Sequence, residues 1–189
     1  MPPHIPAGDK WRKTQLKQIR ETVLREIDTA LRGIDEVVLS RAAKRILQAK
    51  TIFLHGRGRE DIACRALCMR LNHLGLSAFH ITDPCTPPIT QQDLLLLSCA
   101  EALGAEEYAL QTARQAGAQI VVATSSARKF TIPEEELAIQ IPVLAHSVQP
   151  YGAVYEQVLW LVFDALEYLL QAEVGGDEQQ RVSRHANIL

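Results

Sequence analysis

The sequence predicts an α/β fold, a three-layer αβα sandwich in which helices cover both faces of a five-stranded parallel sheet. Short apolar runs recur along residues 51–141, and helical patterns lie between most of them. Two of these runs, LLLL at 94–97 and QIVVA at 119–123, are almost unbroken, which is typical of strands buried on both faces. Strands that alternate with helices in this way favour parallel pairing.

Two helices are expected before the sheet. Residues 10–32 place apolar side chains at helical spacing, with Asp9 as the expected N-cap and Gly33 as the expected stop. Residues 35–49 repeat the helical pattern. Both helices precede the first apolar run, so they add to the sandwich without interrupting it.

The elements of the sandwich itself follow in order. Strands are expected at 51–54, 78–81, 94–97, 119–123 and 138–141, and helices at 60–74, 104–116 and 151–172. Gly75 and Gly117 are placed to end the first two of these helices. The last helix carries a broad apolar stripe that includes Trp160 and Phe163, and this stripe suits either the core or a contact between subunits.

Length and composition indicate a single globular domain. We expect a flexible leader at 1–9, one domain at 10–174 and a polar tail at 175–189, which is a candidate contact for a neighbouring subunit. A net charge of −2 without a basic cluster argues against nucleic acid as a partner. No apolar run approaches the roughly 20 residues that span a bilayer, so no membrane partner is expected.

The four cysteines are too few for a disulfide framework and indicate the cytoplasm. Cys64 and Cys68 share a helix face at a spacing of four residues, but no His or Cys pair completes a metal site around them. We therefore interpret both as small buried hydrophobic residues and expect no metal.

Ligands of open parallel sheets bind at the carboxyl ends of the strands. Three loops are expected there, at 55–61, 98–104 and 124–130. The first reads HGRGRED, and a glycine-rich turn from a strand into a helix commonly offers backbone N–H groups to a phosphate. In this loop, however, Glu60 and Asp61 stand where the phosphate would lie.

Several motifs together resemble the sugar isomerase (SIS) domain, and within it the 6-phospho-3-hexuloisomerase family. They are GRGR at 56–59, MRLNHLG at 69–75, TPPI at 86–89, QDLLLLS at 92–98, YGAVYEQ at 151–157 and RHAN at 184–187. The resemblance covers roughly residues 10–189. It is most specific in the helix around MRLNHLG, in YGAVYEQ and in the terminal RHAN.

The resemblance implies a flavodoxin-like strand order and an activity. The family interconverts a 3-ketohexose 6-phosphate and fructose 6-phosphate through an enediol, without metal or cofactor, in the ribulose monophosphate route of formaldehyde fixation. Its members are typically tetramers with sites near subunit boundaries, so a homo-oligomer, a dimer or a homotetramer, that binds a sugar phosphate is expected. Such chemistry needs a base, a proton donor for the oxygens and an anchor for the phosphate.

The resemblance also implies the site residues. Glu156 matches the family's catalytic base and stands at the first turn of an apolar helix. His185 of RHAN matches a proton shuttle, in its own or a neighbouring subunit. The expected substrate-binding residues are Gly56, Gly58, Arg59, Thr86, Ser98, Thr124 and Ser125. Residue type alone favours an ordinary first-turn glutamate at Glu156 and a solvated tail residue at His185, and only the motif match makes the catalytic interpretation as well supported.

Both phosphate loops depart from the family pattern. Glu60 stands at the position of a serine, and Cys99, Ala100 and Glu101 replace small hydroxyl-bearing residues. One carboxylate about 6 Å from a phosphate of charge about −2 opposes binding by roughly 1.4 kcal/mol in water and roughly 5.5 kcal/mol at an effective dielectric constant of about 20. These energies correspond to about one to four decades of affinity.

Two arrangements would relieve this repulsion. Asp61 is spaced to pair with Arg65, and Glu60 with Arg57 or Arg59. In the third loop, TSSARKF at 124–130, Arg128 and Lys129 offer an alternative phosphate contact, although their residue types favour an exposed basic loop.

Three functions therefore stay open on the sequence. The first is a 6-phospho-3-hexuloisomerase, or a related isomerase, with a relocated anion site. The second is a non-catalytic SIS-domain protein that binds a sugar phosphate or another small ligand in a regulatory role. The third is an enzyme that acts on an unphosphorylated or cationic substrate, for which acidic loops are an advantage.

Overall fold

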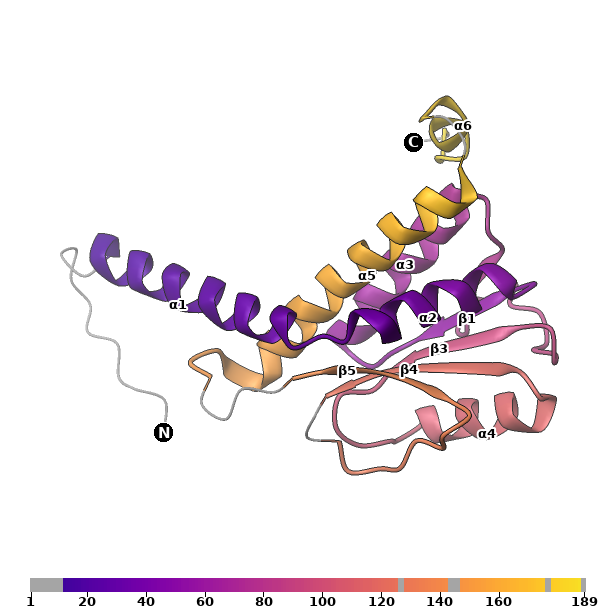
Figure 1. The fold of residues 1–189 in the computed structure, drawn as a ribbon, viewed down its shortest axis with the longest axis horizontal. Coiled ribbons are helices and arrows are strands. Elements are labelled where there is room, and N and C mark those ends of the chain that lie inside the picture. The colour runs from indigo at the N-terminus through magenta and orange to yellow at the C-terminus, as the bar shows by residue number, and fades with distance from the viewer. Residues whose placement is uncertain (1–11, 126–127, 143–146, 176–177, 188–189) are drawn as a thin grey trace.

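The structure, a computed structural model, describes residues 12–125, 128–142, 147–175 and 178–187. Its helices are α1 (Arg12–Arg32), α2 (Glu36–Gln48), α3 (Arg59–Leu74), α4 (Glu106–Ala116), α5 (Ala153–Val174) and α6 (Glu178–Ser183), with a 3-10 turn at Pro150–Gly152. Its strands are β1 (Ile52–His55), β2 (Ala78–His80), β3 (Leu94–Ser98), β4 (Gln119–Ser125) and β5 (Leu137–Ile141). Every predicted strand is present, and the two N-terminal helices precede them (Figure 1).

The five strands form one parallel sheet in the order β2-β1-β3-β4-β5, which confirms the predicted fold and the flavodoxin-like order. Strand β4 runs to Ser125, two residues beyond the predicted end. Thr124 and Ser125 therefore lie in the end of a strand and not, as predicted, in the loop that follows it.

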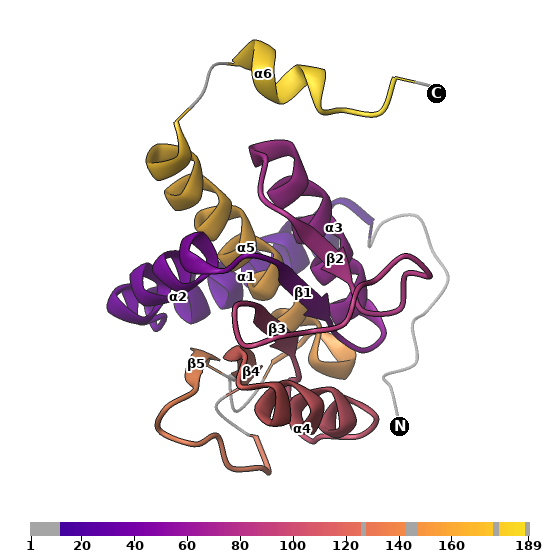
Figure 2. The same cartoon turned by 90° about the vertical axis from the view of Figure 1, so that its right-hand side faces the viewer.

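Helices cover both faces of the sheet (Figure 2). Helices α2, α3 and α5 pack on the face to which Ile52 and Leu54 point. On the opposite face, to which Phe53 points, α4 and flanking loop residues form a second and smaller core. Because β3 lies between these two cores, all of its residues are buried, which explains its unbroken apolar run.

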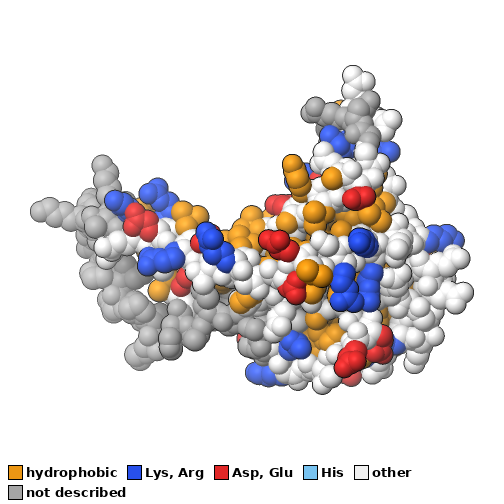
Figure 3. Space-filling model, viewed as in Figure 1, with side chains coloured by type: hydrophobic (Ala, Val, Ile, Leu, Met, Phe, Trp, Pro, Cys, Tyr) orange, Lys and Arg blue, Asp and Glu red, His pale blue; other side chains and the backbone are white. Residues whose placement is uncertain are grey.

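Helix α1 extends beyond the sheet and leaves apolar side chains exposed (Figures 1 and 3). Its C-terminal part packs through the buried Ala30 against the core, whereas Leu16 and Ile19 are more than half exposed. On α5, Phe163 is buried and Trp160 is 43% exposed. The predicted stripe of α5 therefore contributes to the core and also presents apolar surface.

Two helices end at the glycines that the sequence predicts as stops. Helix α1 ends immediately before Gly33, and α3 ends at Gly75, whose φ is +89°. The leader predicted at 1–9 and its N-cap Asp9 lie outside the described residues. Within the predicted tail, α6 packs near α3. None of the helices in the described part of the chain is long and apolar enough to cross a membrane.

Candidate active site

The turn from β1 into α3 depends on two glycines. A Cβ on Gly56 would lie 2.9 Å from the backbone nitrogen of Asp61, so the loop can approach the helix this closely only without a side chain. Gly58 has φ +60° and ψ −123°, a conformation that L side chains rarely adopt. Both predicted glycines thus shape the loop that delivers Arg59 and Glu60 to the carboxyl edge of the sheet.

Three buried side chains meet just behind this loop. Ser98, at the end of β3, donates a hydrogen bond to the carboxylate of Glu60 at 2.8 Å. The hydroxyls of Ser98 and Tyr155 lie 3.1 Å apart, and Tyr155 is the donor of this bond because Ser98 gives its proton to Glu60. Burial raises the pKa of Glu60, although the bond from Ser98, the backbone of Ala100 and the charge of Arg57 act in the opposite direction.

This network occupies the hydrogen-bond donors that the predicted phosphate loop would offer to a ligand. The Ser98 hydroxyl and the Ala100 backbone N–H are donors that a bound phosphate would use, and both are engaged by the carboxylate of Glu60. The carboxylate of Glu60 turns inward to Ser98, and the charge of the predicted partner Arg57 still favours its ionised form. The guanidinium groups of Arg57 and Arg59 form ion pairs with Glu106 and Glu156.

Arg59 and Glu156 join the loop after β1 to the first turn of α5. Their charged groups form an ion pair at 2.5 Å, with the Glu156 side chain 21% exposed and the Arg59 side chain 55% exposed. Arg57 lies 3.8 Å from the buried carboxylate of Glu106 at the start of α4. The arginines of GRGR therefore link two neighbouring helices to the loop.

Asp61 behaves as predicted. Its Oδ2 accepts a hydrogen bond from Nε of Arg65, one turn later in α3, at 2.9 Å. Its Oδ1 accepts a bond from the backbone N–H of Gly56 at 3.2 Å, which ties the glycine turn to the helix. This carboxylate is therefore engaged by its own chain.

A cavity of about 420 Å³ opens beside these groups. Its lining comprises Arg57, Glu60, Ala100, Glu101, Ser125, Pro142, Ser147, Gln149, Gly152, Val154, Tyr155 and Glu156. Of the predicted residues, Glu156 and Ser125 line the cavity directly. Arg59 reaches it through Glu156, and Ser98 through Glu60 and Tyr155.

Two predicted substrate-binding residues are engaged elsewhere. The hydroxyl of Thr124 is fully buried and donates to the backbone oxygen of Ala100 at 3.3 Å. The hydroxyl of Thr86 donates to the backbone oxygen of His80 at 2.8 Å, and Thr86 borders a different groove, over α4. Both hydroxyls thus contribute to the shape of the loops.

The structure places His185 away from Glu156 within one chain. Its ring stacks on that of His73 near the C-terminal end of α3, with the ring centroids 3.7 Å apart. The neighbouring Arg184 donates to the backbone oxygen of His73 at 3.1 Å. Helix α3 starts at the carboxyl edge of the sheet and ends at the opposite edge, so a role of His185 in catalysis requires a neighbouring subunit.

Lys129, in the loop after β4, lies close to the acidic residue Glu101. The ammonium of Lys129 lies 3.8 Å from the carboxylate of Glu101, and both side chains are more than half exposed. The backbone N–H of Lys129 also donates to the backbone oxygen of Glu101 at 2.6 Å. Lys129 therefore partly offsets the charge of Glu101, one of the two acids that depart from the family pattern.

Sequence reasoning missed two residues of the site. Tyr155 lies inside the quoted YGAVYEQ motif, but only the fold shows that its hydroxyl meets Ser98. Glu26 of α1 is buried and accepts hydrogen bonds from Ser147 at 2.9 Å and from the backbone N–H of Val148 at 2.9 Å. Ser147 lines the cavity, so Glu26 supports one wall of the site.

The cysteines are free and three of them are buried, with Cys85 exposed. The Cys64 thiol donates to the backbone oxygen of His55 at 3.2 Å, and burial raises the pKa of the Cys68 thiol to about 11. The interpretation of Cys64 and Cys68 as small buried residues is confirmed.

The chain is similar in sequence to two proteins that carry the same name. No family model matches the chain. A Mycobacterium gastri 3-hexulose-6-phosphate isomerase is 30% identical over 170 residues, which cover 85% of this chain and 84% of the relative. A Bacillus subtilis protein of the same name is 27% identical over 177 residues, which cover 88% of this chain and 95% of the relative.

A solved structure shares the fold. It belongs to a Methanococcus jannaschii protein for which a molecular function of 3-hexulose-6-phosphate isomerase was inferred. The TM-score is 0.76 at 24% identity, and the match covers 93% of this chain and 99% of the other. At this identity the likeness concerns the fold alone.

Proposed function

The chain belongs to the 3-hexulose-6-phosphate isomerase family of SIS-domain proteins, and from this premise we propose that it interconverts 3-hexulose 6-phosphate and fructose 6-phosphate. The observation that carries the proposal is the position of Glu156, at the first turn of α5 on the wall of the cavity and beside Arg59. A carboxylate so placed can act as the base, and the adjacent guanidinium can stabilise the negative charge that develops on the substrate oxygens.

The proposed reaction moves one proton between neighbouring carbons. Glu156 removes the proton from C2 of the 3-ketose, and the C2–H electron pair forms the C2–C3 double bond of an enediolate. The oxygen on C3 takes up a proton, the hydroxyl on C2 loses one, and the carbonyl reforms at C2. Glu156 returns its proton to C3, so no atoms or electrons are gained or lost.

The phosphate of the substrate needs a different anchor from the usual one, because Glu60 engages Ser98 and Ala100. Arg57 is the best candidate, since its side chain is 62% exposed and lines the cavity. Ser125, at the end of β4, lines the same cavity. We assign the relocated anion site to these two residues.

The same network supports a second candidate function. The carboxylate of Glu60 occupies the hydrogen-bond donors of the phosphate loop, Ser98 and Ala100. This occupancy favours a non-catalytic SIS-domain protein that binds an unphosphorylated ligand in a regulatory role. Binding of unphosphorylated fructose, with no reaction of fructose 6-phosphate, is the outcome that this alternative predicts.

We further propose that the protein is a cytoplasmic homo-oligomer. The exposed apolar side chains of α1, such as Leu16 and Ile19, and Trp160 of α5 support subunit contacts. The tail that carries His185 would reach Glu156 only across such a contact. The four free cysteines are compatible with a reducing compartment.

The test is direct conversion. Purified protein is incubated with 3-hexulose 6-phosphate, and formation of fructose 6-phosphate is followed by coupled reduction of NADP. We expect turnover by the native protein and a loss of about 100-fold or more in Glu156→Gln, which keeps the size of the side chain but removes the base. Equal rates of fructose 6-phosphate formation with and without protein would reject the isomerase function. The non-catalytic binding protein would then be the favoured alternative.

A further inference from the structure

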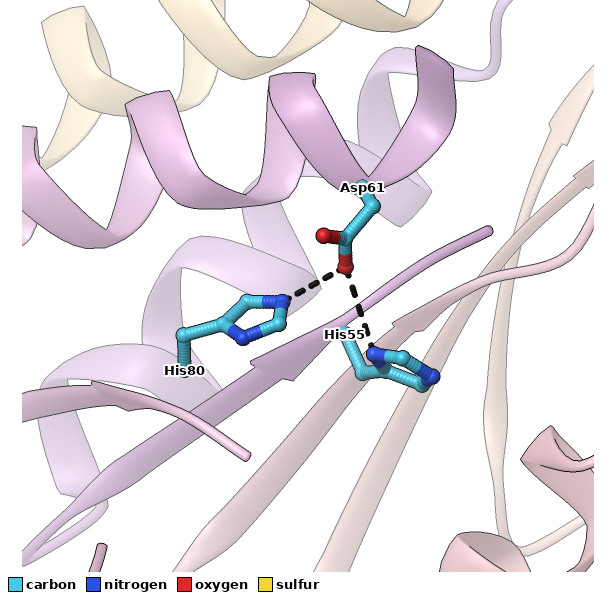
Figure 4. A group of neighbouring side chains, drawn as sticks. All are labelled: His55, Asp61 and His80. Atoms are coloured by element: carbon cyan, nitrogen blue, oxygen red, sulfur yellow. Dashed lines mark hydrogen bonds and ion pairs between the residues drawn. The ribbon is translucent and has the colours of Figure 1, made fainter. Parts of the chain in front are cut away.

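Two histidines and one aspartate converge at the carboxyl edge of the sheet, outside the lining of the cavity. His55 ends β1, His80 ends β2, and Asp61 lies in the first turn of α3. Nδ1 of His55 and Nε2 of His80 both point at Oδ1 of Asp61, at 3.3 and 2.6 Å (Figure 4). The three potential ligand atoms all lie within 4.8 Å of one another.

The two histidines contact Asp61 at different distances. Nε2 of His80 makes a short hydrogen bond to Asp61, and the His80 side chain is only 1% exposed. Nδ1 of His55 is also buried and makes a longer contact, of 3.3 Å, to the same oxygen of Asp61. Oδ1 of Asp61 is therefore shared by two imidazole nitrogens, and a cation bound between them could replace both contacts.

We propose that His55, Asp61 and His80 bind a divalent transition-metal ion of the Zn²⁺ class. Two imidazole nitrogens and one carboxylate oxygen are the ligand types that such ions prefer, whereas Mg²⁺ and Ca²⁺ prefer oxygen alone. In a tetrahedral site with bonds of about 2.0–2.1 Å, ligand atoms lie about 3.3 Å apart. The His55–Asp61 separation already matches this value, and the His80–Asp61 bond must open by about 0.7 Å.

The surroundings orient the three ligands. Nδ1 of His80 lies 2.9 Å from the hydroxyl of Thr82 and accepts a hydrogen bond from the backbone N–H of Thr82 at 3.4 Å. Nε2 therefore carries the proton shared with Asp61, and it would release this proton when a metal ion binds. Arg65 holds Oδ2 of Asp61 at 2.9 Å, so only Oδ1 faces the histidines. Three protein ligands leave the fourth position of a tetrahedral ion for water or a small ligand.

The bound ion would tie β1, β2 and α3 together at the root of the glycine turn. That turn places Arg57 and Glu60 in the lining of the cavity. The ion would therefore hold the loop in position without contacting Glu156, the proposed base. The inference does not depend on the proposed function, because none of the three ligands lines the cavity.

The experiment is a metal titration of the full chain without an affinity tag, after removal of bound metal with a chelator. Zn²⁺ is titrated by calorimetry, and Co²⁺ by its visible absorption. We expect one ion per chain, with the intense visible bands of a low-coordinate cobalt site. The His55→Ala and Asp61→Asn variants should bind more than about 100-fold more weakly, since even the hydrogen-bond partners of metal ligands are worth about 10–100-fold.

The matched control is His73→Ala, which removes an imidazole from the separate pair with His185. It should bind as the native chain does, and circular dichroism should show all variants folded. No uptake by the native chain at metal concentrations well above that of the protein would overturn the proposal. Equal binding by the native chain and His55→Ala would overturn it as well, as would thiolate-to-cobalt bands that indicate binding at Cys85.

Discussion

The hydroxyl of Ser98 donates to the carboxylate of Glu60 at 2.8 Å, although 38 residues separate them in the chain. Glu60 opens a helix at a glycine turn and Ser98 ends a neighbouring strand, and both positions usually serve anion binding. The chain thus supplies its own carboxylate to the donors of its phosphate loop. Whatever the site binds must accommodate this internal anion.

The first prediction concerns the charge of Glu60. Glu60→Gln keeps an acceptor for Ser98 but removes the negative charge, so it should strengthen the binding of fructose 6-phosphate. The electrostatic relief is roughly 1.4–5.5 kcal/mol, or about tenfold to ten-thousandfold in the dissociation constant. Isothermal titration calorimetry of the native chain and the variant measures the change.

Glu101→Gln is the control for this prediction. Glu101 is 59% exposed and already lies near Lys129, so its removal should change the affinity by less than about threefold. If Glu60→Gln has no larger effect than Glu101→Gln, the carboxylate of Glu60 does not oppose the phosphate.

The second prediction ranks the bonds of the buried network. Ser98→Ala removes the hydroxyl donor of a buried carboxylate and should lower the free energy of unfolding by about 1–3 kcal/mol. Tyr155→Phe leaves the Ser98–Glu60 bond intact and should cost only about 0.5–1.5 kcal/mol. Urea denaturation at neutral pH compares the two variants, and a larger loss in Tyr155→Phe would contradict the assigned direction of the bonds.

The third prediction concerns pH and the support of the cavity wall. Burial tends to raise the pKa of Glu26, but hydrogen bonds from Val148, Gln149 and Ser147 and the charge of Arg25 hold it below its ordinary value. A lowered pKa means that this stabilisation is present above the pKa of the unfolded chain. It is lost as the pH falls through the pKa of the folded chain.

Glu26→Gln should therefore lower the free energy of unfolding by about 1–3 kcal/mol at pH 7. The difference from the native chain should begin to shrink as the pH falls below the ordinary pKa of a glutamate, and it should disappear once the pH has fallen through the lowered pKa of Glu26 in the folded chain. Glu21→Gln is the exposed control on the same helix, with an expected effect within about 0.5 kcal/mol at either pH. A difference that persists unchanged at low pH would show that the charge of Glu26 is irrelevant.

The fourth prediction tests a site shared between subunits. Glu156→Gln and His185→Ala should each lack activity, because each removes one of the proposed groups from every site. Dissociating and reassembling the two variants together should restore part of the activity, since some sites then combine a native Glu156 with a native His185 from another subunit. No recovery, with mixed oligomers demonstrated by mass spectrometry, would place both groups outside a shared site.

The sheet and the local ion pair were predictable for physical reasons. Runs such as LLLL at 94–97 lie between two cores, and burial on both faces leaves a visible apolar pattern. The pair of Asp61 with Arg65 follows from one helical turn of spacing. Both features depend only on the local geometry of a strand or a helix.

The remaining contacts depend on how the elements pack. Glu26 and Val148 are 122 residues apart, and nothing in either segment encodes the other. His55 and His80 have no spacing typical of metal ligands, but β1 and β2 pair with Leu54 opposite His80. That register alone brings the two histidines to the same edge. Polar contacts between distant elements can therefore be predicted only when the strand order is known in addition to the apolar pattern of the sequence.

The most direct test of the account is proton exchange at the substrate carbon. Fructose 6-phosphate is incubated with the protein in D2O and followed by proton NMR, with Glu156→Gln as the control. The account predicts loss of the C3 proton signal and appearance of the 3-ketose with the native protein, and neither with the variant. No exchange at high concentrations of folded native protein, or equal exchange with Glu156→Gln, would contradict enediol chemistry at Glu156.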